Sequence, residues 1–163
     1  MAALIKANEH HLDTYLPAVA RLATPDAAVR HLAEVAAAAE RGQVCEWHIF
    51  RGDELCGAIR LHQIDRENRK AALACFLGAG QQGSGLATAC LRAVIAQAFN
   101  RFKLNRIEWQ CASDNAASER LAKRLGFAWE GMLRQAELLH GAYVDHFIYS
   151  LLREDAAPLL QSA

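Results

Sequence analysis

Apolar residues recur at helical spacing through the amino-terminal part of the chain. They predict one amphipathic helix over residues 8–22, preceded by a short strand at the start of the chain. A second helix is expected from Thr24 to about residue 41, because Thr24 can cap its amino end and Pro25 suits the first helical position. Gly42 then ends this helix.

Beyond Gly42 the pattern changes to strand-like apolar runs over residues 44–51, 55–64 and 70–77. Two short polar segments separate these runs, and both are typical of the turn of a β-hairpin. We therefore expect three consecutive strands, each antiparallel to the one before it.

The second half of the chain alternates between helix and strand patterns. Residues 84–99 are apolar nearly all round, which predicts a buried helix, and residues 105–111 predict a strand. A further helix is expected to start at a cap formed by Asp114 or Asn115 and to end before Gly126. Two last strands complete the series, over residues 128–139 and 142–152.

This order of elements predicts an α+β fold. We expect a mixed, mostly antiparallel sheet with one crossover connection that makes one neighbouring pair of strands parallel, flanked by about four helices. The chain contains no repeats, low-complexity tracts or Pro/Gly/Ser-rich linkers, and 163 residues suffice for one core but not for two. The expectation is a single domain over residues 1–163, with a frayed end from Arg153.

The 18 basic and 18 acidic residues of the chain cancel, which argues against a nucleic-acid-binding protein. They are unevenly distributed, however. Between Glu67 and Glu108 there are six basic residues and no acidic one, and the rest of the chain carries the opposite excess. This basic segment is either an ordinary solvated surface or a face toward an anionic ligand, and composition alone leaves both interpretations open.

Five cysteines, an odd number with no CxxC pair, favour a reducing cytoplasm over an oxidising compartment. The first residues lack the apolar core of a signal peptide, and no segment approaches the roughly 20 apolar residues of a membrane span. His10 and His11 have no further ligand at a suitable spacing, so no metal site is expected. We expect a cytoplasmic protein without membrane or nucleic-acid partners.

A glycine-rich segment between the third strand and the next helix has two interpretations. Gly78, Gly80 and Gly83 match the GxGxxG pattern of dinucleotide-binding proteins, but hairpin strands precede them and no acidic residue follows at the required distance. The shifted frame Q-x-x-G-x-A, from Gln82 to Ala87, places a glycine loop directly before a helix. Unpaired N–H groups at such a helix start can bind a pyrophosphate, although a plain connecting turn has the same composition.

Two later motifs add to this loop. Asp114-Asn115-x-x-Ser118 follows the next strand, and Leu125-Gly126-Phe127 follows the next helix. Together with Q-x-x-G-x-A they resemble the GNAT N-acetyltransferases. The run from Glu130 to Asp145 is similar to the RimJ/RimL type, which acetylates α-amino groups of ribosomal proteins, and within it to the ribosomal-protein-serine N-acetyltransferases. The resemblance covers residues from about 54 to 152 and is weakest in the amino-terminal third.

The resemblance implies a central pair of parallel strands that splay apart to bind acetyl-CoA. Backbone groups of Phe76 and Leu77 would pair with the pantetheine arm and polarise the thioester carbonyl. The pyrophosphate and the rest of the cofactor would be held by Gln82, Gly83, Ser84, Gly85, Leu86, Ala87, Thr88 and Asn115. Because the basic segment contains the glycine loop, composition and resemblance indicate the same anionic ligand.

The resemblance also implies two catalytic residues. Ser118 would protonate the CoA thiolate, in place of a tyrosine that many relatives have where this chain has Ala122, and Glu137 would be the general base. By itself, Ser118 is also a helix-capping partner, and a strand glutamate such as Glu137 is more often a surface or paired carboxylate than a base. The amine would attack the thioester directly in a ternary complex.

The expected acceptor is a primary amine. An α-amine, with a pKa of about 7.7 to 8, loses its proton near neutral pH more readily than lysine at about 10.4, which favours a protein N-terminus. Two alternatives stay open: a small amine such as a polyamine, amino acid or aminoglycoside, and a non-catalytic module that binds CoA or a nucleotide. A homodimer is among the oligomeric states that the sequence leaves open.

Overall fold

The computed structural model of the chain describes residues 1–157. The chain forms two compact units. The first contains Met1–Gln63 and Ala74–Ala87, and the second contains Ile64–Leu73 and the chain from Thr88 onward. The single domain over residues 1–163 stays a prediction.

The amino-terminal residues of the first unit form three short helices, α1 (Ala2–Ala7), α2 (Glu9–Asp13) and α3 (Pro17–Ala20). The predictions of an initial strand and of one continuous helix over residues 8–22 are therefore wrong. Pro17 explains one break, since the residue before a proline avoids helical geometry and Leu16 has φ −135° and ψ 56°. The apolar spacing instead reflects one shared cluster, in which Ile5, Leu12 and Ala20 are buried.

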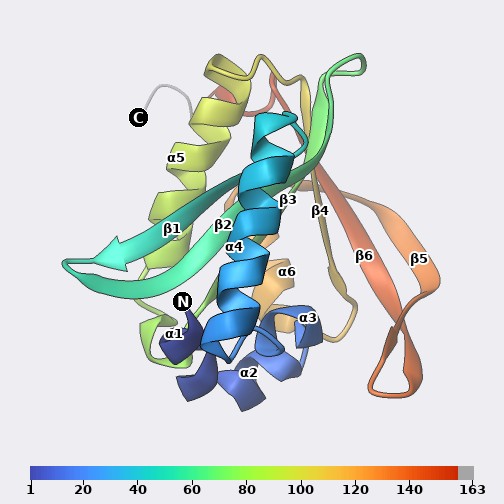
Figure 1. Cartoon of the computed structure of the whole chain (residues 1–163). Helices are drawn as coiled ribbons and strands as arrows, with labels where there is room; N and C mark the ends of the chain where they lie inside the picture. The colour runs from blue at the N-terminus through green and yellow to red at the C-terminus, as the bar shows by residue number, and fades with distance from the viewer. Residues whose placement is uncertain (158–163) are drawn as a thin grey trace. The chain divides into compact units, whose positions relative to one another are not determined.

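The rest of the first unit closely follows the sequence pattern. In α4 (Pro25–Glu40), Thr24 Oγ1 caps the amino end by accepting from the backbone N–H of Ala27 at 3.3 Å. This helix lies against β1 (Cys45–Arg51), as Figure 1 shows. β1 pairs antiparallel with β2 (Glu54–Asp65), as predicted for that hairpin. The first unit also contains the part of β3 (Lys70–Leu77) from Ala74 onward and a short 3-10 helix, η1 (Ala79–Gln81).

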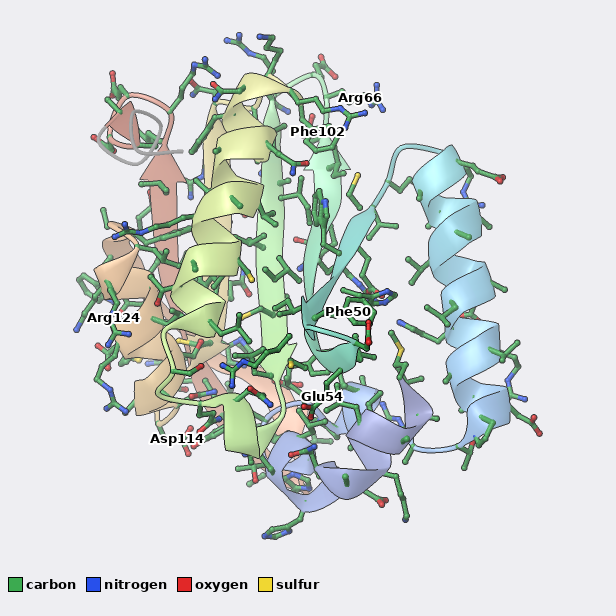
Figure 2. All side chains as sticks on the ribbon, turned by 90° about the vertical axis from the view of Figure 1, so that its left-hand side faces the viewer. Phe50, Glu54, Arg66, Phe102, Asp114 and Arg124 are labelled. Carbon is green, nitrogen blue, oxygen red and sulfur yellow. The ribbon has the colours of Figure 1, made fainter. Side chains whose placement is uncertain are left out.

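The second unit contains the remaining helices and strands. α5 (Leu86–Asn100) enters it and buries one face around Leu91, Ile95 and Phe99, and β4 (Arg106–Ala112) follows. α6 (Ala116–Arg124) lies against β4, and Figure 2 labels Asp114 in the turn before this helix and Arg124 at its last residue. A long hairpin of β5 (Ala128–Leu139) and β6 (Ala142–Leu152) completes the unit.

The strands form one six-stranded sheet in the order β1-β2-β3-β4-β6-β5. β3 and β4 are parallel, with Lys70–Ala72 paired to Arg106–Glu108, and α5 makes the crossover between them. β4 and β5 both pair antiparallel with β6. The predicted mixed α+β sheet with one crossover is therefore confirmed.

The carboxyl-terminal residues that the structure describes are held in place. The backbone N–H of Arg153 donates to the carbonyl of Asn105 at 2.9 Å, its guanidinium donates to the carbonyl of Phe99, and Ala156 is fully buried. The prediction of a frayed end from Arg153 is therefore wrong for residues 153–157, and its remainder, residues 158–163, lies outside the described residues. Within residues 1–157, no helix is both long and apolar enough to cross a bilayer.

An ion-pair network joins β4 to β5 and β6 in the second unit. Arg106 donates to the two carboxylate oxygens of Glu130 at 2.7 and 2.5 Å, and to Glu108 at 2.9 Å. Ser150 Oγ donates to Glu130 at 2.7 Å. The hydrogen bonds from Arg106, and then that from Ser150, lower the pKa of Glu130 to about 2.

Replacing Glu130 by Gln should destabilise the protein in a pH-dependent way. Because the pKa of Glu130 is lower in the folded state, its contribution is complete above about pH 4.5 and is lost as the pH falls toward about 2. Glu130→Gln should therefore lower the urea midpoint at neutral pH, and the difference from wild type should narrow in acid. Urea titrations followed by circular dichroism measure this, with the exposed Glu154→Gln as control. A difference independent of pH would contradict it.

Candidate active site

The glycine loop of the first unit is exposed from Gln82 to Gly85. Gly83 and Gly85 have φ values of 71° and 79°, in the left-handed region that favours glycine. A Cβ built on either glycine meets no atom within 4 Å. In residues 1–157, the backbone N–H groups of Gly83, Ser84 and Gly85 have no acceptor. The loop therefore offers free amide donors and open space to an anion.

α5 begins at Leu86, two residues later than the sequence pattern indicates, and Ser84 supplies the reason. Ser84 Oγ donates to the carbonyl of Gln81 at 2.7 Å and accepts from the N–H of Leu86 at 3.4 Å, so it stands before the helix. Leu86, Ala87 and Thr88 form the first helical turn, whose N–H groups lack acceptors within the helix. The N–H groups of Ala87 and Thr88 extend the donors of the loop, whereas that of Leu86 is already bonded to Ser84.

The amino-terminal helices anchor the loop. Asn8 Oδ1 accepts from the N–H of Ala79 at 2.8 Å, while Asn8 Nδ2 donates to the carbonyl of Leu4 at 2.8 Å. Gln82 Nε2 lies 3.0 Å from His11 Nε2. The side chain of Gln82 therefore connects the loop to α2, and its contact with acetyl-CoA stays a prediction.

The carboxyl end of β3 carries Phe76 and Leu77, both half-buried. Phe76 packs against the apolar cluster around Ile5. β2 approaches this backbone so closely that a Cβ on Gly57 would overlap the carbonyl oxygen of Phe76 and lie 3.0 Å from Leu77 Cα. Only glycine fits at position 57 without a backbone shift, so this contact determines where the carbonyl and N–H groups of Phe76 and Leu77 lie.

Ser118 lies in the first turn of α6 in the second unit. Asn115 caps this helix, since its Oδ1 accepts from the N–H of Ser118 at 3.1 Å. Ser118 Oγ accepts from Trp109 Nε1 at 3.0 Å. Trp109 is only 3% exposed and packs edge-on against Phe127, with ring centroids 5.8 Å apart. The helix cap and the buried indole together orient the hydroxyl of Ser118.

Trp109 does not use the hydroxyl proton of Ser118, because the indole can only donate. The neighbouring group is the thiol of Cys111, whose pKa is raised by burial and lowered to a lesser degree by its hydrogen bond with Ser118. On the same helix, Glu119 accepts from the hydroxyl of Tyr149 at 3.1 Å. Burial, and then the hydrogen bond to Glu119, raise the pKa of Tyr149 to about 12, so this phenol stays neutral.

Glu137 lies on β5, opposite Val144 of β6. Its Oε2 is 3.0 Å from His146 Nε2. The side chain of Glu137 is 39% exposed, whereas that of His146 is 17% exposed. Glu137 is therefore a half-exposed carboxylate with one oxygen held by a more buried imidazole.

Ser118 and Glu137 lie on opposite faces of the ladder that β4 and β6 form. Trp109, which holds Ser118, is on β4; His146, which holds Glu137, lies opposite Ala112 of β4. Directly opposed residues share a face, and faces alternate along a strand. Positions 109 and 112 are three apart in a continuous register, so the two side-chain pairs point to opposite sides. The structure does not bring the two residues into contact.

Trp109 and His146 are the two site residues that sequence reasoning missed. Neither belongs to the motifs that carried the resemblance, and only the strand register joins each to its partner. A ring nitrogen that can donate a hydrogen bond, carried on a predicted strand, is the signal that both share.

Residues 2–128, more than three quarters of the chain, match the acetyltransferase (GNAT) domain family. The chain belongs to this family. The GNAT fold predicted from the three motifs is thereby confirmed. The predicted relationship to the ribosomal-protein acetyltransferases is confirmed as well, by the two comparisons that follow.

The ribosomal-protein-serine acetyltransferase of Escherichia coli (strain K12) is 36% identical to this GNAT chain over 111 residues, or 68% of the chain. The chain spans only 62% of the length of that protein. The structure of RimL, a ribosomal L7/L12 α-N-protein acetyltransferase in complex with coenzyme A, superposes with a TM-score of 0.88. That match is 26% identical and covers 93% of this chain and 85% of the other.

A third comparison is with the microcin self-immunity acetyltransferase MccE in complex with acetyl-CoA and AMP. It has a TM-score of 0.87 and 26% identity, and it covers 93% of this chain and 84% of that one. Similar GNAT structures therefore bind coenzyme A or acetyl-CoA.

Part of the basic segment of this GNAT chain is neutralised by neighbouring carboxylates. Arg106 is paired with Glu108 and Glu130, and Lys70 Nζ lies 3.6 Å from Glu108. The segment's other cations are exposed: Arg69, Arg92, Arg101 and Lys103. Its formal charge therefore overstates the positive charge that is available to an anionic ligand.

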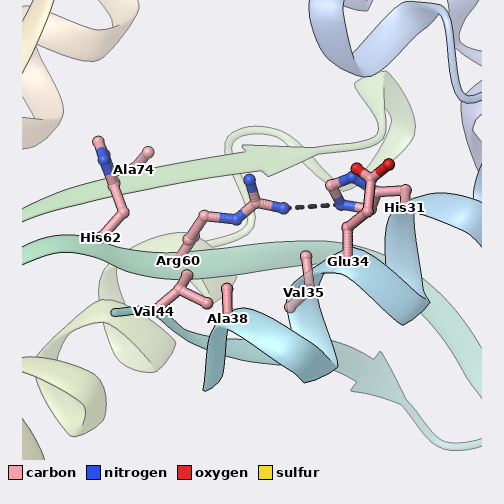
Figure 3. Close-up of a pocket in the computed structure, with 8 residues that line it drawn as sticks. All are labelled: His31, Glu34, Val35, Ala38, Val44, Arg60, His62 and Ala74. Carbon is pink, nitrogen blue, oxygen red and sulfur yellow. Dashed lines mark hydrogen bonds between the residues drawn. The ribbon is translucent and has the colours of Figure 1, made fainter. Parts of the chain in front are cut away.

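A separate cavity of about 360 Å³ lies in the first unit, between α4 and the strands (Figure 3). Arg60 crosses it, donating to Glu46 at 2.8 and 2.5 Å and lying 2.7 Å from His31 Nε2. Burial, and then the charge of Arg60, lower the pKa values of His31 and His62, so both imidazoles are neutral at neutral pH. The guanidinium of Arg60 therefore already has partners in Glu46 and His31.

Replacing Gly57 by Ala should destabilise the protein by about 1–3 kcal/mol, because the new methyl group must displace the backbone of Phe76. Chemical denaturation measures the loss, and the affinity for coenzyme A should fall with it. Gly80→Ala is the matched control, since a Cβ there meets nothing within 4 Å. Equal stability of the two variants would show that β2 and β3 can separate without cost.

Proposed function

We propose that this GNAT protein transfers the acetyl group of acetyl-CoA to the α-amine of a protein N-terminus, of the ribosomal-protein-serine type. One observation carries the proposal: in a chain of the GNAT family, the exposed loop from Gly83 to Gly85 offers free N–H groups and open space to an anionic cofactor directly before α5. Direct transfer needs a base for the attacking amine and a proton for the departing thiolate. Glu137, held by His146, is the proposed base, and Ser118, held by Trp109, is the proposed acid.

The glycine loop is the proposed site of the pyrophosphate of acetyl-CoA, which supplies the activated acetyl group. The free N–H groups from Gly83 to Gly85, together with the first turn of α5, suit an anion, and the helix dipole adds to this. Phe76 and Leu77 would bind the pantetheine arm through backbone groups. The remaining proposed contacts are Gln82, Ser84, Leu86, Ala87, Thr88 and Asn115.

Proton transfers follow from the chemistry of the two side chains. Glu137 would take a proton from the ammonium group of the acceptor, directly or through one water, so that the amine attacks the thioester carbon. Ser118 would give its hydroxyl proton to the sulfur as the carbon–sulfur bond breaks. The attacking nitrogen must lose its second proton to form the amide, and Ser118 would regain a proton from it through solvent. The hydrogen bond from Trp109 leaves that proton available and directs it away from the indole.

An α-amine suits this base better than a lysine does. Its pKa of about 7.7 to 8 leaves a large neutral fraction near neutral pH, whereas a lysine at about 10.4 is almost entirely protonated. The similarity to a ribosomal-protein-serine acetyltransferase supports an N-terminal serine as the acceptor.

An acceptor screen by mass spectrometry tests the proposal. The protein is incubated with acetyl-CoA and peptides that begin with serine, the same peptides with a blocked N-terminus, and a panel of polyamines, amino acids and aminoglycosides. Acetylation of the free peptides but not of the blocked ones is expected. Acetylation of small amines alone would indicate the small-molecule alternative, and coenzyme A binding without transfer to any acceptor would indicate a non-catalytic module.

Glu137→Gln should lower kcat by roughly 10²-fold, the usual loss for a general base, with nearly unchanged affinity for coenzyme A. Thiol release measures turnover, and calorimetry measures affinity. Glu54→Gln, at another strand glutamate, is the control and should have wild-type turnover. Wild-type turnover in Glu137→Gln would remove this residue from the mechanism.

Gly85→Val should abolish coenzyme A binding. Valine disfavours a φ of 79°, and its side chain would fill the open space beside the free amides. Gly52→Val imposes comparable backbone strain, at φ 58°, in the turn between β1 and β2. Calorimetry should show loss of binding in the first variant only. Unchanged affinity in Gly85→Val would place the pyrophosphate elsewhere.

A further inference from the structure

β5 carries two more residues than its partner strand just before Glu137. Leu133 is paired with His146 and Glu137 with Val144, so three residues of β5 stand opposite Asp145 alone. Within this bulge Gln135 has φ 50°. A bulge of this kind bends a strand and redirects the side chains that follow it. The direction of the Glu137 side chain is therefore set by the bulge.

Asp145 accepts two hydrogen bonds, one from the bulge and one from the segment after β4. Its Oδ1 accepts from the backbone N–H of Gln135 at 2.8 Å, and its carbonyl accepts from the N–H of Ser113 at 2.9 Å, in the segment after β4. The backbone that leads to Glu137 is thus connected through one residue to the end of the strand that carries Trp109.

His146 follows Asp145 and holds the end of the Glu137 side chain. A carboxylate can only accept, so the 3.0 Å contact requires the proton on His146 Nε2. The other carboxylate oxygen, Oε1, has no partner in residues 1–157. One oxygen is thus held by a largely buried imidazole, while the other is free to accept a proton.

We propose that His146 is a positioning residue for Glu137, which it orients by donating Nε2–H to Oε2 so that Oε1 faces the acceptor amine. This inference rests on the proposed function, in which Glu137 is the base. His146 itself need not touch the substrate. A glutamate side chain has three rotatable bonds, and holding one oxygen removes most of the orientations in which the other cannot reach the amine.

His146→Leu and His146→Gln form the decisive pair of variants. Both fill the half-buried site, but only glutamine keeps an N–H donor for Glu137. We expect His146→Leu to lower kcat by about tenfold, because even ~1 Å of misplacement can cost up to 10²-fold. Its KM for acetyl-CoA should be unchanged, and His146→Gln should keep turnover within about threefold of wild type.

His48→Leu is the matched control for a structural effect. His48 is also a strand histidine beside a glutamate, with Nε2 3.2 Å from Glu46 Oε1, and it lies in the first unit. Circular dichroism and thermal unfolding of each variant separate loss of folding from loss of turnover. If His146→Leu does not fold, His146→Asn serves in its place, since its shorter amide has a donor that falls short of Glu137. The kcat of His146→Asn should then be lower than that of His146→Gln.

A double-mutant cycle keeps failure of the inference apart from failure of the proposed function. In the Glu137→Gln background, His146→Leu should cause no further loss of kcat, since the residue acts through Glu137. A tenfold loss in both backgrounds, or no loss in His146→Leu while Glu137→Gln is slow, would overturn the role of His146 alone. Wild-type turnover in Glu137→Gln would instead overturn Glu137 as the base, and this inference with it.

Discussion

The antiparallel ladder between β4 and β6 is the constraint on which the proposed chemistry of the second unit depends. Its register is continuous from Arg106 opposite Leu152 to Ala112 opposite His146. Because side chains alternate between faces, this register alone sends Trp109 to one side and His146 to the other. A shift by one residue would exchange the two faces and separate both Ser118 and Glu137 from the groups that orient them.

Backbone donors, rather than basic side chains, dominate the proposed cofactor loop of the first unit. Gly83 and Gly85 supply the left-handed conformations, and Asn8 ties the segment just before them to the amino-terminal helices. An anion held by amides requires a rigid loop more than a high charge. A low demand for charge is consistent with the state of the basic segment, in which Arg106 is paired with Glu108 and Glu130 and Lys70 lies near Glu108.

Much of the fold could be predicted from local pattern. The bounds of β3, β5 and β6 coincide with those of the predicted strands, and α4 begins at the Thr24 cap as expected. The amino-terminal helices could not be predicted in this way, since three short helices around Ile5 produce the same apolar spacing as one long helix. The ordering of residues 153–157 could not be predicted locally either, because Arg153 is held by Phe99 and Asn105, which are distant in sequence, and Ala156 is buried.

The sequence by itself determined the family, the glycine loop and the identity of Ser118 and Glu137 as candidates, because short motifs encode local backbone geometry and side-chain type. Only the tertiary structure decided how these groups are oriented. The indole of Trp109 and the imidazole of His146 reach their partners through strand pairing, and the β5 bulge opposite Asp145 changes the direction of Glu137. Register, bulges and hydrogen bonds between strands join residues far apart along the chain, so they cannot be inferred from local sequence patterns.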